Sequence, residues 1–391
     1  MLDKLKTALY FLYNNEVRAF LFQLITLAII GYIFYAGIGN MFSNIEERGI
    51  KSGFDFLTDE AGFDVAEHLI EYSAESTNFR VFLVGIINTL VVSGAAIVFA
   101  SILGLIIGVA RLSNNYIVSK LASTYVEIFR NIPILLQILF WYNIILISLP
   151  AVRNSINFFD GIFINLRGIF LPKPIFDNSF LWVVIAIIIG ILAYIFIKKY
   201  FNKKHDKTGI ATKTWMYFVG FIFIFPSLIF LLLGLPISFE YPALKGFNFT
   251  GGTSISPEFI ALAFALGIYT ATYISEAIRS GIESVDKGQK EAAKALGLTP
   301  FQSLKMIILP QALSVAIPPI INQYLNLTKN SSLAAAIGYS ELVSVFTGTV
   351  LNNVGQAIEI ILMTMAVYLT ISLLISLLLN IVNVKMQFKS R

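Results

Sequence analysis

The chain has 391 residues, of which 57% are hydrophobic and only 13% are charged, and its mean hydropathy is +0.78. Soluble domains carry about 25% charged residues, so this composition indicates an integral membrane protein and excludes an ordinary soluble enzyme. The net charge of +5 would also suit a nucleic-acid-binding protein, but the positions of the basic residues, given below, explain it by membrane topology. The chain has no cysteine and only two histidines, His68 and His205, so we expect neither a disulfide nor a metal site.

Eight apolar segments are each long enough to span about 30 Å of hydrocarbon. They cover roughly residues 19–39, 80–110, 121–149, 180–197, 215–235, 257–275, 304–327 and 355–382. A cleaved signal peptide is the alternative for the first segment, but its apolar region would be shorter. The pattern predicts an all-α integral membrane protein with about eight transmembrane helices.

Charged residues between the spans predict the side of the membrane that each loop occupies. Basic residues flank both termini and follow the fourth span: Lys4, Lys6, Arg18, Lys198, Lys199, Lys203, Lys204, Lys207, Lys213, Lys385, Lys389 and Arg391. Because basic loops stay in the cytoplasm, both termini and the loop after the fourth span are predicted to be cytoplasmic. A lipid headgroup site is the alternative role for that loop. Residues 40–79 are acidic and fall outside, as a solvated loop or as a contact surface for another protein.

Proline interrupts two of the predicted spans. Pro133 lies in the third span, and Pro310 and the pair Pro318-Pro319 lie in the seventh. Proline lacks the N–H that a helix needs, and membrane helices are broken where they line cavities or gates. We therefore expect the seventh helix to be broken.

The polar loop between the sixth and seventh spans has a sequence that is typical of helices. Residues 291–296 are strong helix formers. Gly297 suits the left-handed position that ends a helix, and Thr299 and Pro300 suit the first positions of the next one. A short helix with a charged end, held between two membrane helices, is predicted to dock onto another protein.

The same loop carries a motif. Its elements are Glu291-Ala292-Ala293, Gly297, Ile307 and Leu309-Pro310. Their spacing matches E-A-A-x3-G-x9-I-x-L-P, so the chain is similar to the permease subunits of binding-protein-dependent ABC importers. The resemblance implies that residues 286–300 form the cytoplasmic coupling helix that the ATPase holds, with contact residues Gly288, Gln289, Glu291, Ala292, Ala293 and Gly297.

Other segments resemble the same family. They are Asn88-Thr89-Leu90; Tyr125 to Pro133 with Gln137, where Ile132 replaces the usual threonine; Tyr273 to Arg279 with Gly281-Ile282; and Lys329, Ser331-Ser332-Leu333, Ile337-Gly338 and Glu341-Leu342. The last two resemble polar amino-acid permeases of the histidine/glutamine type. The resemblance implies an N-terminal helix and loop (1–79), a five-helix type I permease core in two parts (80–150 and 257–391) and an inserted loop with a helix pair (151–256). These additions resemble the long permease subunits of general L-amino acid importers for glutamate, glutamine, aspartate and asparagine.

Polar side chains within the spans are further candidate sites, because such groups are costly in a bilayer. Glu127 with Arg130 and Glu276 with Arg279 are three residues apart, so each pair shares a helix face. They form either an inner gate of interhelical ion pairs or simple intrahelical bridges. Four amides face a polar substrate path or form interhelical hydrogen bonds: Asn88, Asn322, Gln323 and Asn326.

The resemblance implies a transport subunit of a bacterial inner membrane rather than an enzyme. Its implied partners are ATP-binding subunits, a second related permease in a heterodimer, a periplasmic amino-acid-binding protein and a polar L-amino acid substrate. The sequence lacks a G-x4-G-K-[S/T] loop, so we expect ATP and Mg on the ATPase and no cofactor on this chain. The rivals are an ion-coupled secondary transporter, which would show inverted repeats, and a lipid-modifying membrane enzyme, which would need a metal cluster, paired carboxylates or a nucleophile.

Overall fold

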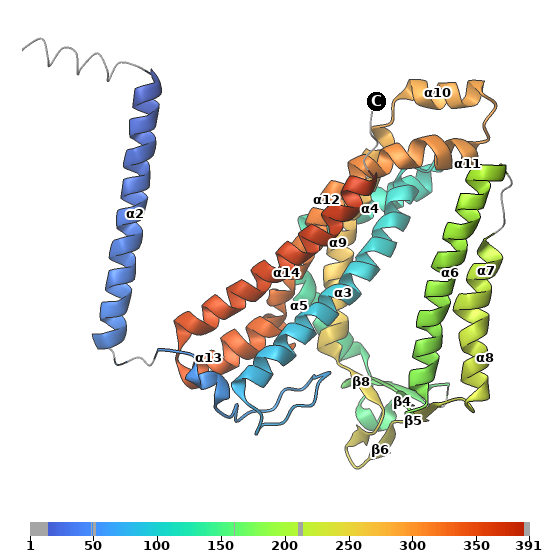
Figure 1. Cartoon of the computed structure of the whole chain (residues 1–391). Coiled ribbons are helices and arrows are strands. Elements are labelled where there is room, and N and C mark those ends of the chain that lie inside the picture. Colours follow the sequence, from blue (N-terminus) through green and yellow to red (C-terminus); the bar gives the residue numbers. More distant parts are fainter. Residues whose placement is uncertain (1–14, 48, 50–51, 160, 210–213, 387–391) are drawn as a thin grey trace, which may run out of the picture. The chain divides into compact units, whose positions relative to one another are not determined.

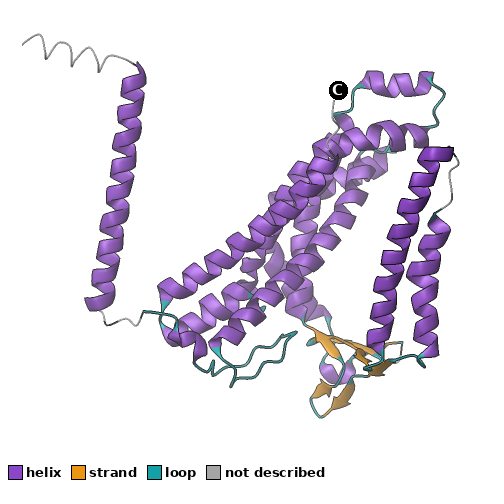
Figure 2. Cartoon of the chain, viewed as in Figure 1, coloured by secondary structure: helices purple, strands orange, loops and turns teal. Residues whose placement is uncertain are grey.

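The computed structural model describes residues 15–47, 49, 52–159, 161–209 and 214–386. In this part of the chain, seven helices are long and apolar enough to cross a membrane, or eight if α4 and α5 count as one span. The predicted helical membrane fold is thus confirmed (Figure 1, Figure 2). Five basic residues used to predict the topology lie outside the described residues: Lys4, Lys6, Lys213, Lys389 and Arg391.

The chain forms two compact units, of which the first comprises the residues up to Arg130 and those from Gly267 onwards. Its helices are α2 (Asn15–Glu47), α3 (Asn78–Arg111), α4 (Tyr116–Asn131), α9 (Pro257–Glu283, which begins in the second unit), α10 (Lys287–Ala295), α11 (Pro300–Ser303), α12 (Leu309–Asn330), α13 (Leu351–Val354) and α14 (Ala357–Met386). Short 3-10 helices cover Asp55–Thr58 and Ser331–Ile337, and π-helical segments cover Leu304–Ile308 and Val343–Val350.

The acidic segment before α3 folds onto the helices instead of standing free in solvent. Phe56 is buried in a cluster with Val81 of α3 and with Phe346, and the Phe56 and Phe346 ring centroids are 6.3 Å apart. The Asn78 side chain at the start of α3 donates a hydrogen bond of 2.9 Å to the Phe56 carbonyl. Buried apolar side chains and a buried hydrogen bond therefore hold this segment in one conformation.

The seventh predicted span is not broken, so that prediction is wrong. The chain is helical from Pro300 to Ile337, with Pro318 and Pro319 inside α12. Pro310 lies in the first turn of α12, directly after the π-helical segment Leu304–Ile308. A π-type turn spaces its hydrogen bonds differently from an α-helix, and membrane helices re-satisfy the backbone groups that proline frees. The third span, by contrast, does stop at Pro133, which separates α4 from α5.

The second unit, Asn131–Leu266, combines helices with short strands. Its helices are α5 (Ile134–Ser148), α6 (Phe180–Thr208), α7 (Trp215–Val219) and α8 (Phe225–Leu232), with a 3-10 turn at Val152–Asn154 and a π-helical turn at Gly220–Ile224. Its strands are β1 (Ile156–Phe158), β2 (Ile162–Asn165), β3 (Gly168–Leu171), β4 (Lys173–Phe176), β5 (Ile237–Glu240), β6 (Ala243–Lys245), β7 (Asn248–Thr250) and β8 (Thr253–Ile255). The pair α6 and α8, which pack together, corresponds to the predicted inserted helix pair.

The strands were not predicted, because the two segments that contain them, residues 156–176 and 237–255, were assigned to loops. They form antiparallel sheets in the orders β1-β2-β3-β8, β4-β5 and β6-β7 (Figure 2). A small core of Val152, Phe170 and Phe249 lies among them, with the Phe170 and Phe249 rings 4.8 Å apart. Strands of three or four residues give only one or two alternations of apolar and polar residues, which is too short a pattern to separate a strand from a loop.

Candidate coupling helix and transport path

The short helix predicted in the loop between the sixth and seventh spans is present as α10, and local chemistry defines both of its ends. Asp286 is the N-cap, and its carboxylate accepts a hydrogen bond of 2.6 Å from the Gly288 N–H. At the other end, Gly297 has a φ of +71°. The Gly297 N–H donates to the Lys294 carbonyl, and the next N–H, of Leu298, donates to the Ala293 carbonyl. This pair of bonds is a Schellman motif, which requires a residue that tolerates the left-handed conformation.

The helix after α10 begins as the sequence predicts. Thr299 is the N-cap of α11 and Pro300 follows it. The Thr299 hydroxyl accepts from the Gln302 N–H, and the Gln302 side chain accepts from the Thr299 N–H at 2.9 Å, which is a complete capping box. Two capped helices and a left-handed glycine between them make this loop a defined shape (Figure 1).

Most of the predicted contact residues of α10 face away from the chain, but one does not. Gly288, Gln289, Glu291, Ala292 and Gly297 are exposed, whereas Ala293 is fully buried. Ala293 therefore packs against its own chain and fixes the position of α10, and its side chain is not part of the exposed face. Sequence reasoning missed two exposed apolar residues of the same loop, Leu296 (77% exposed) and Phe301 (71% exposed). Large apolar side chains exposed in a polar loop are typical anchors of a protein interface.

The helix that leads into α10 packs closely on α12. A side-chain carbon placed on Gly281 would lie 2.6 Å from the Ala312 carbonyl oxygen and 2.9 Å from the Ala316 side chain. Only glycine permits this approach of α9 to α12. A displacement of α10 would therefore act on two membrane helices through a tight contact.

Charged residues at the same end of α9 form a network of three ion pairs. The Glu276 carboxylate lies 2.5 Å from Arg111, the last residue of α3, and 2.6 Å from Arg279. Arg279 also lies 2.5 Å from Glu283. The predicted pair of Glu276 and Arg279 is thus formed within α9, and Arg111 adds an interhelical ion pair that sequence reasoning missed. The side chain of Arg111 is only 14% exposed.

The other predicted pair, Glu127 with Arg130, does not form an ion pair in the described part of the chain. The Arg130 guanidinium instead lies over the Tyr273 ring of α9, 5.1 Å from its centroid. This is the geometry of a cation–π contact. The Tyr125 hydroxyl, five residues earlier in α4, donates a hydrogen bond of 2.8 Å to the Ile268 carbonyl of α9.

A polar cavity of about 240 Å³ lies between α9 and α12. It is lined by Tyr269, Thr270, Tyr273, Gln323, Asn326, Lys329 and Asn330. The lining holds one formal charge, that of Lys329, because the other residues are neutral. Gln323 and Asn326 are among the predicted path amides. Asn322 is exposed on the same helix but does not line the cavity.

The fourth predicted amide, Asn88, is buried and joins segments of its own chain. Its side-chain amide donates to the Glu67 carbonyl at 2.8 Å and to the Ser340 carbonyl at 2.7 Å. Next to it, the Glu341 carboxylate is fully buried and accepts hydrogen bonds from the Val343 and Ser344 N–H groups and from the Tyr368 hydroxyl. These bonds are structural, because the Asn88 and Glu341 side chains are buried and each is hydrogen-bonded within the chain.

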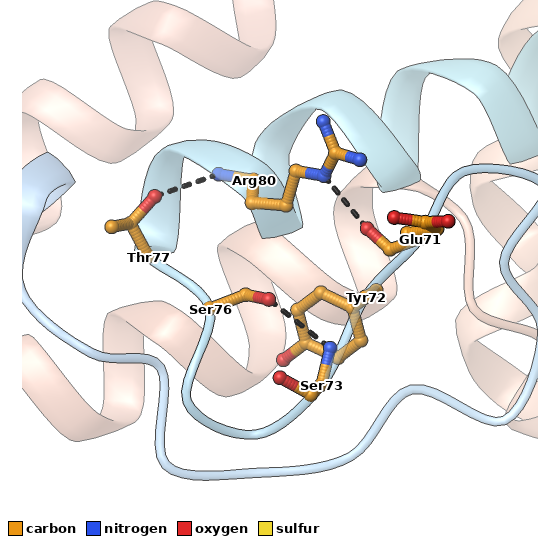
Figure 3. Close-up of a pocket in the computed structure, with 6 residues that line it drawn as sticks. All are labelled: Glu71, Tyr72, Ser73, Ser76, Thr77 and Arg80. Atoms are coloured by element: carbon orange, nitrogen blue, oxygen red, sulfur yellow. Dashed lines mark hydrogen bonds between the residues drawn. The ribbon is translucent and has the colours of Figure 1, made fainter.

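A wider hollow of about 540 Å³ lies where the acidic segment meets α3 (Figure 3). Its lining consists of Glu71, Tyr72, Ser73, Ser76, Thr77 and Arg80. Arg80 donates a hydrogen bond of 2.8 Å to the Glu71 carbonyl, and Tyr72 donates one of 2.6 Å to the Phe63 carbonyl. Burial, and to a smaller extent the charge of Asp64, raises the pKa of Tyr72. The hollow is thus a polar surface at the N-terminal end of α3.

Comparison with known proteins decides the family. The family model described as binding-protein-dependent transport system inner membrane component matches residues 207–388. The putative amino-acid ABC transporter permease protein YhdX of Escherichia coli K12 is 49% identical over 375 residues, which are 95% of this chain and 94% of that protein. The chain belongs to the family of amino-acid ABC transporter permeases.

Two further relatives match this permease along its length. The general L-amino acid transport system permease protein AapQ of Rhizobium johnstonii is 44% identical, with 97% of the permease and 95% of the relative covered. The glutamate/glutamine/aspartate/asparagine transport system permease protein BztB of Rhodobacter capsulatus is 38% identical. The match covers 97% of the permease and 96% of that relative. The predicted resemblance to permeases of polar amino-acid ABC importers is therefore confirmed.

Proposed function

We propose that this permease is the membrane-spanning subunit of an ATP-driven importer for polar L-amino acids of the glutamate, glutamine, aspartate and asparagine group. The observation that carries the proposal is identity of 38–49% over nearly the whole chain to permeases whose names state amino-acid transport. The names of the last two relatives motivate the substrate group. An ion-coupled secondary transporter is disfavoured, because the family is one of binding-protein-dependent transport components.

The coupling site is the exposed face of α10. Glu291 offers a charge for a basic residue of an ATP-binding subunit, and Ala292 permits close approach. Leu296 and Phe301 extend this face with apolar surface that a partner would bury. Gly288, Gln289 and Gly297 shape its two ends. The ATP-binding subunit binds ATP with Mg and hydrolyses the ATP. This chain binds no cofactor.

The transport path is the polar cavity between α9 and α12. Amides and a lysine that are exposed or half-buried on a membrane helix are costly against lipid, so they are expected to face water or substrate. A cavity of about 240 Å³ is smaller than the roughly 300–1,000 Å³ of drug-sized ligand sites, which suits a small ligand. The Lys329 ammonium is suited to the carboxylate that all amino-acid substrates share. The network of Arg111, Glu276 and Arg279 closes the path on the cytoplasmic side.

The remaining partners and the orientation complete the proposal. The permease lies in a bacterial inner membrane with both termini in the cytoplasm, as the basic residues predict. It pairs with a second, related permease, and a periplasmic amino-acid-binding protein docks on the outer side. The hollow beside Arg80 is the surface of this chain that we assign to the binding protein.

Uptake by the reconstituted importer tests the proposal. The two permeases and the ATPase are placed in liposomes with ATP inside, and binding protein with labelled L-glutamate, L-glutamine, L-aspartate or L-asparagine is added outside. We expect uptake that requires both ATP and binding protein, and little uptake of leucine. Uptake driven by an ion gradient without ATP would contradict the proposal. Liposomes with a hydrolysis-deficient ATPase are the control.

A further inference from the structure

The ribbon β4–β5, a two-stranded sheet of the second unit, has one apolar face. Its antiparallel register places Lys173 opposite Glu240, Pro174 opposite Phe239, Ile175 opposite Ser238 and Phe176 opposite Ile237. Successive side chains of a strand point to opposite faces. Pro174, Phe176, Ile237 and Phe239 therefore share one face, and Lys173, Ile175, Ser238 and Glu240 share the other.

The apolar face of the ribbon is open. Phe176 and Phe239 are each 54% exposed, and neither strand has a fully buried residue. An isolated two-stranded sheet is marginal in water and needs packing on its apolar face. Leaving two aromatic rings in water costs free energy, which indicates that something outside this chain covers the apolar face.

The position of the ribbon, next to the ends of two membrane helices, indicates what covers its apolar face. Three residues separate the end of β4 from the start of α6 at Phe180, and β5 follows α8, which ends at Leu232. The Asp177 N–H donates to the Pro236 carbonyl, so the two connections are joined. The Phe176 ring packs against the Phe180 ring of α6, with centroids 4.6 Å apart and the ring planes tilted by 40°. The apolar face of the ribbon is thus continuous with the exposed apolar surface of membrane helices.

The depth of the ribbon follows from the length of α6. Its apolar part runs from Phe180 to the residue before Lys198, which is about 27 Å at 1.5 Å per residue and matches a hydrocarbon core of about 30 Å. Asp177 is exposed, and hydrogen bonds from the Ser179 hydroxyl and from nearby N–H groups lower the pKa of its carboxyl. Asp177 is therefore charged and marks the water side. The ribbon starts at the level of the lipid headgroups.

We propose that the apolar face of β4–β5 lies on the membrane surface and inserts Phe176 and Phe239 among the lipids of the leaflet at the N-terminal end of α6. Lys173 and Glu240, at the far end of the ribbon, lie on the opposite face and point to water. In the orientation proposed above, this is the outer leaflet. The ribbon anchors the inserted helix pair at a fixed depth.

Fluorescence quenching of single labels tests the proposal, and the absence of cysteine from the chain makes the labelling direct. The environment-sensitive fluorophore NBD is attached to Phe239→Cys in the full importer, reconstituted in phosphatidylethanolamine/phosphatidylglycerol liposomes. Ser238→Cys is the matched control, because it lies on the same strand and the opposite face. The complex with the wild-type chain gives the background from partner subunits. Quenching by nitroxide-labelled lipid and by aqueous iodide is compared at both positions.

The two quenchers give opposite patterns if the proposal is right. We expect NBD at residue 239 to be quenched several-fold more strongly by the nitroxide lipid than NBD at residue 238, and iodide to show the reverse. Equal quenching of both positions by iodide would overturn the proposal. Protection of residue 239 from both quenchers would also overturn it, because a protein partner would then cover the face. The assay reads depth and not transport, so its result is independent of the proposed substrate.

Discussion

The ion pair of Arg111 with Glu276 allows a quantitative prediction about how α3 is held to α9. Exposed ion pairs contribute about 0–1 kcal/mol, whereas removal of one partner from a buried pair costs about 3–5 kcal/mol. The side chains of Arg111 and Glu276 are 14% and 32% exposed, which places this pair between the two limits. We therefore expect the coupling free energy of the pair to be about 2 kcal/mol.

A double-mutant cycle measures this coupling. Arg111→Gln, Glu276→Gln and the double variant are made in the assembled complex, and free energies of unfolding are obtained by SDS titration in mixed micelles. Because Glu276 also pairs with Arg279, the cycle is needed to isolate the pair with Arg111. The double variant should be more stable than the sum of the two single effects predicts.

The exposed end of the same network supplies the control. Glu283 is 51% exposed and lies four residues after its partner Arg279. Pairs of this kind on a helix surface contribute about 0.2–0.5 kcal/mol, so a cycle on Arg279 and Glu283 should give little coupling. If the pair of Arg111 and Glu276 gave no more coupling than this control, the assignment of Arg111 as the residue that holds α3 to α9 would be refuted.

Three further predictions concern single positions. Gly281→Val should prevent close packing of α9 on α12 and reduce the yield of assembled complex in size-exclusion chromatography, whereas Gly94→Val, where no atom lies within 4 Å of the added carbon, should not. Glu341→Ala should lower the free energy of unfolding by about 2–3 kcal/mol because it leaves buried N–H groups unpaired, and Glu341→Gln, which keeps an acceptor, should cost clearly less. Lys329→Gln should raise the substrate concentration for half-maximal uptake while assembly and basal ATPase activity stay normal; an unchanged uptake curve would remove Lys329 from the path.

The existence of α10 and its C-terminal end could be predicted from the sequence because they depend on neighbours in the chain. Gly297 and Thr299, which were predicted to end one helix and begin the next, act on residues within five positions, whereas the N-cap Asp286 was not predicted. The membrane spans could be predicted for a related reason, since mean hydropathy over about 20 residues is a local property. Ala293 shows the limit of such local prediction. The sequence identifies it as a helix former, but not that its side chain is buried against its own chain.

Features that depend on distant residues could not be predicted. Arg111 and Glu276 are 165 positions apart, and a single sequence contains no signal that joins them. The strand β3 pairs with β8 across the whole helix pair, and each strand is too short for its alternation to be distinct. The seventh span was predicted to break at its prolines, yet α12 continues through Pro318 and Pro319 because packing in the folded chain overrides the local preference.

ATPase activity of the complete importer in lipid tests the central claim. This claim is that α10 couples ATP hydrolysis on the ATP-binding subunit to the membrane helices. The variant is Glu291→Lys with Gly297→Asp. The matched control is Lys245→Glu with Gly246→Asp, which also reverses a charge and also replaces a left-handed glycine, but in the β6–β7 turn. Binding protein loaded with amino acid should stimulate hydrolysis in the wild-type and control complexes and fail to stimulate it in the α10 variant. Equal stimulation in all three complexes would contradict the account.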